Sequence, residues 1–152
     1  NKVRELVLET YSRNENEIMD GMDISLLSID QKNRTIEWAG ANLPLHLCSD
    51  NTLQSFAPQK QPIGRTIHPE PFYSTSIAYK GGEMIYLSSD GYADQFGEKT
   101  GKKFMKKNFH ELLRSICMKD ITSQKQVIIS TFEQWRGEQE QIDDVCVLGF
   151  RL

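Results

Sequence analysis

Two apolar runs that each meet an aspartate constrain this chain more than any other feature. The first, residues 84–89, leads directly into Asp90, and the second, residues 145–148, begins directly after Asp143 and Asp144. Short apolar runs of this kind predict buried strands. An acidic residue where one strand ends and another where a second strand begins can place two carboxylates at one rim of a sheet. A hard divalent cation requires such an arrangement of oxygen donors.

The remaining pattern predicts an α+β domain. Apolar residues at helical spacing predict helices over residues 3–11, 109–117 and 121–135, and alternating or β-branched runs predict strands over residues 23–30, 35–39, 43–48, 52–56, 72–79, 84–89 and 145–150. Residues 31–34 read as a hairpin turn, residues 40–42 as a break, and residues 57–71 as an irregular, proline-bearing stretch. This order predicts one layered domain of antiparallel strands and flanking helices over residues 1–152.

Composition excludes several classes of protein. A net charge of −3 gives no reason to expect nucleic acid as a partner. No apolar stretch has the length of a membrane helix, and no signal-peptide pattern opens the chain. The three cysteines are odd in number and widely spaced, which argues against a disulfide framework and a paired-cysteine zinc site. We therefore expect reduced core cysteines, with Cys117 and Cys146 in apolar patterns, and a cytoplasmic location.

Asp90 and Asp143 are the candidate metal ligands. Mg²⁺ and Mn²⁺ prefer oxygen donors, and Mg²⁺ keeps several waters, so two strand-end aspartates form a plausible partial set. Gly91 lets the backbone turn away directly after the first ligand, while Asp94 and Asp144 are close enough to orient waters or steady the ligands.

Two other interpretations of these residues remain open. Asp90 and Gly91 can form a turn, and Asp143 can be a cap, since both are common uses of aspartate. The three histidines, His46, His68 and His110, have no second histidine or cysteine at ligand spacing, which favours surface or structural roles. No nucleophile elbow, glycine-rich phosphate loop or zinc-protease helix motif is present, so covalent catalysis has little support.

Five segments occur in the order found in one protein family. They are DGMDI at residues 20–24, AGANLPL at 39–45, PIG at 62–64, SDGYADQFG at 89–97 and DDV at 143–145. In this order the chain resembles bacterial serine phosphatases of the PPM type, which are PP2C-like. The subgroup is typified by the stage II sporulation phosphatase and by stress-response regulators of partner-switching pathways.

The resemblance implies an αββα sandwich in which two antiparallel sheets carry a pair of Mn²⁺ or Mg²⁺ ions at one edge. It implies that a water bridging the ions attacks a phosphoserine or phosphothreonine in line. Matched by position, Asp90 and Asp143 correspond to metal aspartates, and Asp94 and Asp144 lie beside them. Gly40, Asn42, Gly64 and Gly91 correspond to structural motif positions, and residues 57–71 take the place of a mobile flap beside the active site.

The chain departs from this family at its beginning. Members place two strands and a helix ahead of the helix over residues 3–11, and these carry an aspartate that bridges both ions. We therefore expect residues 1–152 to be the C-terminal portion of a phosphatase domain, inactive in isolation, with exposed sheet edges that favour self-association.

The parent is expected to be a cytoplasmic phosphatase or the cytoplasmic domain of a larger sensor protein. Its expected partner is a phosphoprotein such as an anti-sigma-factor antagonist. Two alternatives are a pseudophosphatase or regulatory module that binds a protein without turnover, and an α+β interaction domain whose aspartates are turns and caps.

Overall fold

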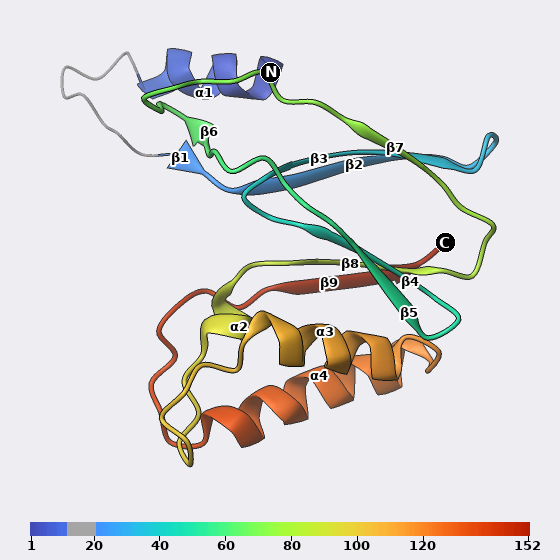
Figure 1. The fold of residues 1–152 in the computed structure, drawn as a ribbon, viewed down its shortest axis with the longest axis vertical. Helices are drawn as coiled ribbons and strands as arrows, with labels where there is room; N and C mark the ends of the chain where they lie inside the picture. Colours follow the sequence, from blue (N-terminus) through green and yellow to red (C-terminus); the bar gives the residue numbers. More distant parts are fainter. Residues whose placement is uncertain (12–20) are drawn as a thin grey trace. The chain divides into compact units, whose positions relative to one another are not determined.

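The computed structural model describes residues 1–11 and 21–152, which form two compact units (Figure 1). The first unit comprises Asn1–Leu45 and Phe56–Lys80, and the second comprises His46–Ser55 and Gly81–Leu152. Asp20, the first residue of the DGMDI segment, lies outside the described residues.

The first unit contains one helix and two antiparallel sheets. Its elements are α1 (Lys2–Tyr11), β1 (Gly21–Met22), β2 (Ile24–Asp30), β3 (Thr35–Ala41), β6 (Ile63–Gly64) and β7 (Thr75–Ala78). One sheet has the order β2-β3-β7, and β1 pairs with β6 in the other. The predicted hairpin between β2 and β3 is confirmed: the Asp30 carboxylate accepts a hydrogen bond from the Asn33 backbone N–H at 2.9 Å, and Arg34 takes a left-handed φ of 52°.

Two predictions for the first unit need correction. Strand β3 continues through Gly40 and Ala41, because these residues pair with Ser25 and Ile24 of β2. Gly40 packs so closely against the Trp38 ring and the Leu43 carbonyl that a Cβ would be 2.5 Å from each. The expected break therefore begins only at Asn42, whose φ is 59°. Residues 57–71 are also less irregular than predicted, since they contain β6.

The second unit contains a four-stranded antiparallel sheet and three helices. Its elements are β4 (Leu45–Ser49), β5 (Thr52–Phe56), β8 (Met84–Ser88), α2 (Gly91–Asp94), α3 (Lys106–Ile116), α4 (Ile121–Arg136) and β9 (Val147–Arg151), with Leu45 and Phe56 grouped in the first unit. The strand order is β5-β4-β8-β9, and α3 and α4 lie along one face of this sheet (Figure 1). A buried cluster joins sheet and helices: Cys48, Met84, Tyr86, Tyr92, Phe104, Phe109, Leu113 and Cys117.

The two long helices of the second unit are confirmed close to their predicted positions. Asp120 caps α4 by accepting a hydrogen bond from the Ser123 backbone N–H at 2.9 Å, and Gly137 ends it at a φ of 56°. Among the described residues, none of the helices has the length and apolar character that a membrane span requires.

The cysteines differ from the sequence prediction. Cys48 on β4 and Cys117 directly after α3 form a disulfide, with Cα atoms 6.2 Å apart, so the prediction of reduced thiols is wrong for this pair. Their separation of 69 residues gives no spacing signal, and only the packing of α3 against β4 brings them together. Cys146 is free and exposed rather than part of the core.

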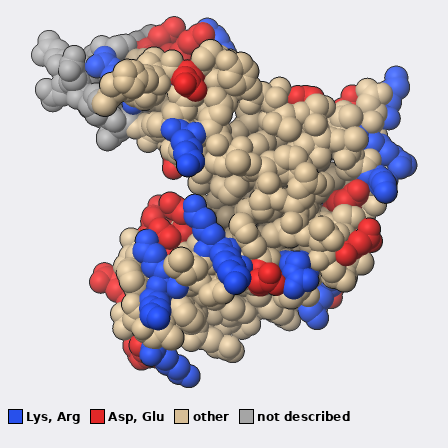
Figure 2. All heavy atoms as spheres, in the orientation of Figure 1, with Lys and Arg blue, Asp and Glu red and all other residues tan. Residues whose placement is uncertain are grey.

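Charged side chains of both signs are interspersed on the face drawn in Figure 2. Lysines and arginines lie among aspartates and glutamates there rather than forming a continuous basic surface. That face therefore offers no electrostatic reason to expect a polyanionic partner.

His46 is a buried histidine of the second unit with a lowered pKa. His46 on β4 is 2% exposed, its Nδ1 lies 2.8 Å from the Ser55 hydroxyl, and its ring centroid is 4.7 Å from that of His110 on α3. Burial, reinforced by the charge of His110, lowers the pKa of His46 to about 4. The folded state therefore holds His46 neutral where an unfolded chain would already bind a proton.

We expect the free energy of unfolding to fall as the pH is lowered from about 6.5 to about 4, because the unfolded state takes up the His46 proton first. The loss from this group amounts to roughly 3 kcal/mol across that window. Urea unfolding between pH 7 and pH 4 measures it, with His46→Gln expected to flatten the curve and His68→Gln, an exposed control, expected to retain it. Identical pH profiles for His46→Gln and the unsubstituted chain would contradict the assignment.

Candidate functional site

Asp90 and Asp143 lie at one rim of the second unit's sheet. Strands β8 and β9 are antiparallel neighbours whose register pairs Ser88 with Val147. The chain leaves β8 toward Asp90 at the same end at which it enters β9 from Asp143. The structure thus brings together the two apolar runs from which the metal hypothesis started.

Gly91 is the point of closest contact between the two segments. A Cβ built on Gly91 would lie 2.5 Å from the Asp144 carbonyl oxygen and 3.3 Å from the Asp143 Cβ. The residue after Asp90 is therefore packed directly on the backbone of Asp143 and Asp144. Only a residue without a side chain allows this approach.

We expect Gly91→Ala to destabilise the second unit by about 1–3 kcal/mol, because the new methyl group meets backbone atoms that cannot rotate away. The same displacement should separate Asp90 from Asp143 and weaken any metal binding there. Chemical denaturation and Mn²⁺ titration measure the two effects. Gly81→Ala is the control: its Cβ would meet no atom within 4 Å, so only the strain at a φ of 109° remains. Equal Mn²⁺ affinity in both variants would argue against this role for Gly91.

Ser89 fastens the same two segments by hydrogen bonds. Its backbone N–H donates to the Cys146 carbonyl at 3.0 Å, and its hydroxyl donates to the Asp144 carbonyl at 2.7 Å. The hydroxyl also accepts from the Cys146 backbone N–H at 2.9 Å. These bonds continue the ladder beyond the ends of β8 and β9. Sequence reasoning missed this role, although a serine immediately before the Asp-Gly pair was visible.

The two candidate ligands differ in how their carboxylates are used. Asp90 occupies the N-cap position of α2, yet its side chain makes no capping hydrogen bond, and the residue is exposed. Asp143 is also exposed, and its Oδ1 accepts a hydrogen bond from the Asp144 backbone N–H at 2.7 Å. Asp90 therefore begins α2 without its carboxylate acting as a cap. The cap interpretation of Asp143 accounts for one of its two carboxylate oxygens, which accepts the bond from the next residue.

The two neighbouring aspartates also differ. Asp94, at the end of α2, forms an ion pair with Lys103 at 3.0 Å, and both side chains are partly exposed. Lys103 as its partner was not foreseen from the sequence. Asp144 is exposed, and its backbone carbonyl, rather than its carboxylate, receives the Ser89 hydroxyl.

The donor set suits one hydrated hard cation better than a pair of ions. Two exposed carboxylates at one rim match the few protein oxygens that Mg²⁺ takes while retaining waters. Residues 1–11 and 21–152 contain no group of three or more histidine, cysteine, aspartate or glutamate side chains placed to hold a metal. These residues fit a singly occupied, mostly hydrated site and do not by themselves fit a two-ion cluster.

The remaining motif residues belong to the first unit. Asn42 donates its side-chain N–H to the Asp23 carboxylate at 2.8 Å, and Gly64 pairs with Gly21 between β6 and β1. Gly40 lies under the Trp38 ring. Each of these residues supports strand packing or a turn within that unit, consistent with structural use.

Comparison with known proteins gives one family and several similar folds. The family model described as stage II sporulation protein E matches residues 3–152. The SiaA-PP2C domain of Pseudomonas aeruginosa is 26% identical, with a TM-score of 0.78 over 86% of this chain and 51% of that one. A search of curated proteins found no match.

Two more distant structures share the fold. The phosphatase domain of the cell fate determinant SpoIIE from Bacillus subtilis is 13% identical with a TM-score of 0.64, covering 99% of this chain and 70% of that one. RsbX in complex with magnesium is 18% identical with a TM-score of 0.56, covering 99% and 71%. The chain thus spans about half the length of the SiaA domain and more of the other two. The likeness confirms the predicted α+β class with antiparallel sheets and flanking helices.

Proposed function

Because the chain belongs to the stage II sporulation protein E family of PP2C-type phosphatases, we propose that it forms part of a metal-dependent protein phosphatase domain that hydrolyses phosphoserine. Asp90 and Asp143 are the proposed ligands of a Mn²⁺ or Mg²⁺ ion. The observation that carries the proposal is the packing of Gly91 on the backbone of Asp143 and Asp144, which holds both aspartates at one rim.

Each residue at the rim has a distinct task in this proposal. The Asp90 and Asp143 carboxylates bind the ion, and Ser89 and Gly91 hold their two segments together. Asp94, restrained by Lys103, orients waters at the end of α2, and Asp144 adds negative charge beside the site. A bound divalent ion supplies an activated water and neutralises charge on the phosphoryl group. SpoIIE soaked with manganese and RsbX with magnesium support this choice of metals.

The complete catalytic centre needs more donors than these residues provide. The family resemblance implies two ions, whereas the described residues contain no group of three metal-binding side chains. We infer that further carboxylates come from a region ahead of this sequence in a complete phosphatase domain. The 152 residues alone would then bind metal weakly and turn over no substrate. The proposed setting is a cytoplasmic partner-switching pathway, with a phosphoprotein such as an anti-sigma-factor antagonist as substrate.

A second candidate function is binding of a phosphoprotein without hydrolysis. In this function, one hydrated ion at Asp90 and Asp143 attracts the phosphate group without positioning an attacking water.

Parallel measurements separate the two functions. Two proteins are compared: residues 1–152, and a longer form that includes a region corresponding to the rest of the SiaA domain. For each, calorimetry measures Mn²⁺ binding, and hydrolysis assays measure turnover of p-nitrophenyl phosphate and of a phosphoserine protein. Mn²⁺-dependent turnover by the longer form supports the phosphatase. Binding of the phosphoserine protein without turnover by that form supports the binding module, and neither activity would refute both.

A further inference from the structure

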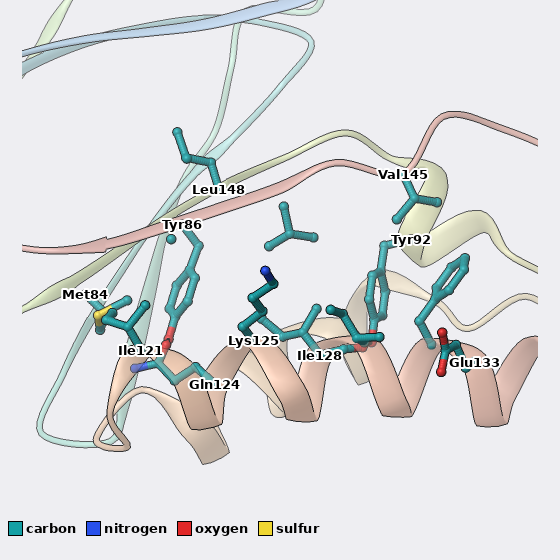
Figure 3. A pocket seen from close by; sticks show the side chains of 14 residues that line it. Met84, Tyr86, Tyr92, Ile121, Gln124, Lys125, Ile128, Glu133, Val145 and Leu148 are labelled. Atoms are coloured by element: carbon teal, nitrogen blue, oxygen red, sulfur yellow. Dashed lines mark hydrogen bonds between the residues drawn. The ribbon is translucent and has the colours of Figure 1, made fainter.

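An apolar hollow opens beneath the outer edge of β9 in the second unit. It has a volume of about 380 Å³ and lies between strands β8 and β9 and helix α4 (Figure 3). Its walls include Met84, Tyr86, Tyr92, Ile128, Phe132 and Val147. Within the described part of the chain, β9 pairs only with β8, so its other edge presents unpaired backbone groups.

One strand position beside the hollow has no side chain. Gly149 lies over Tyr86, and a Cβ there would be 3.1 Å from the Tyr86 ring. The Tyr86 and Tyr92 hydroxyls point away toward α4, where they donate to the Gln124 side chain at 2.6 Å and to the Ile128 carbonyl at 2.8 Å. Their polar ends are satisfied within the unit, and mainly carbon surface faces the opening.

Large apolar side chains surround this opening and are exposed. Ile121 and Ile129 on α4 are 46% and 44% exposed, and Leu148, which is 54% exposed, points from β9 away from α4 (Figure 3). A free strand edge beside a continuous apolar patch is typical of a surface that another strand and helix cover.

The charges on α4 indicate which partner fits. Lys125, Ile129 and Glu133 are exposed, line the hollow and follow one another at four-residue spacing, so they share one face of the helix. A twofold axis at Ile129 would bring Lys125 of one copy opposite Glu133 of another, and the reverse. The face is therefore electrostatically complementary to itself, as a symmetric dimer requires.

We propose that this face joins two copies of the chain. The β9 edges pair antiparallel across a twofold axis, which extends the sheet from one copy into the other. The two α4 helices run antiparallel beneath that seam, with Ile121 and Ile129 covering the hollow and two Lys125–Glu133 pairs closing it. This proposal is independent of any phosphatase activity.

Charge reversal across the face tests the proposal by sedimentation equilibrium at low salt. We expect the 152-residue chain to dimerise, and Lys125→Glu or Glu133→Lys alone to weaken the dimer at least about tenfold, because each leaves two like-charged pairs at the seam. The combined exchange of both residues should restore dimerisation. Lys32→Glu, an exposed change of the same charge in the hairpin of the first unit, is the matched control.

A second variant separates loss of the dimer from loss of the folded structure. Ile129→Asp changes a side chain that is already 44% exposed in the single chain and lies at the proposed twofold axis, so it should abolish the dimer while leaving the far-ultraviolet circular dichroism unchanged. A monomer at every attainable concentration, or a dimer indifferent to these changes, would overturn the proposal. If the chain stays monomeric and hydrogen exchange at the Leu148 backbone amide slows only when an upstream segment is added, the face belongs to that segment instead.

Discussion

Replacing Asp90 by asparagine in a longer phosphatase form of this protein is expected to lower Mn²⁺-dependent turnover by about 100-fold or more, because changes even to groups that only support metal ligands cost 10–100-fold. Asparagine keeps the size of the side chain and one oxygen but removes the negative charge that attracts the ion. The Asp90 side chain makes no capping hydrogen bond, so the change should leave the fold intact. Turnover of p-nitrophenyl phosphate against Mn²⁺ concentration measures the effect.

The control for this prediction is another exposed aspartate. Asp50 lies in the turn between β4 and β5 at a φ of 49°, a conformation that asparagine also tolerates. Asp50→Asn should retain full turnover, and Asp143→Asn should repeat the loss seen for Asp90→Asn. Unchanged turnover in the Asp90 variant would remove that residue from the metal site and leave the turn interpretation standing.

The parts of this fold that the sequence predicts correctly are those whose signals lie within a single hairpin or helix. The β2–β3 hairpin has alternating strands and an Asp30–Asn33 turn, and α4 has a capping aspartate and a terminal glycine, so each carries its own boundaries. Helix α2 was missed because four residues are too few for a helical period to emerge. Strand β3 was cut short because Gly40 looks like a breaker until the Trp38 ring is placed over it.

Contacts between distant segments were harder to predict than the elements. The sequence pointed to Asp90 and Asp143 because each adjoins an apolar run, but it contained no sign of the hydrogen bonds that join Ser89 to residues 144 and 146. The Cys48–Cys117 disulfide was mispredicted for the same reason. The pattern of apolar residues shows which face of a helix or strand is buried, but it does not show which other helix or strand covers that face. Cys146 shows the converse error, since an apolar neighbourhood in sequence did not make it part of the core.

Tyr92 should be the most sensitive core position next to the candidate site. Its ring centroid lies 5.3 Å from that of Phe104, 4.7 Å from that of Phe109 and 5.1 Å from that of Phe132. Tyr92→Ala is therefore expected to lower the free energy of unfolding by about 3–5 kcal/mol, as large aromatic truncations in cores do. Tyr92→Phe, which loses only the hydrogen bond to the Ile128 carbonyl, should cost about 1 kcal/mol. Urea denaturation of the 152-residue chain compares the two.

The position of Tyr92 links this stability to metal binding. Tyr92 is the second residue of α2 and follows Gly91, so the aromatic cluster anchors the helix that begins directly after Asp90. Loss of the ring should loosen α2 and weaken Mn²⁺ binding even under conditions where most molecules remain folded. Leu113→Ala, in the same cluster but on α3, should lower the free energy of unfolding without weakening Mn²⁺ binding. Equal Mn²⁺ affinity of the folded Tyr92→Ala and Leu113→Ala variants would show that α2 does not position the carboxylate and that the β8–β9 rim alone does.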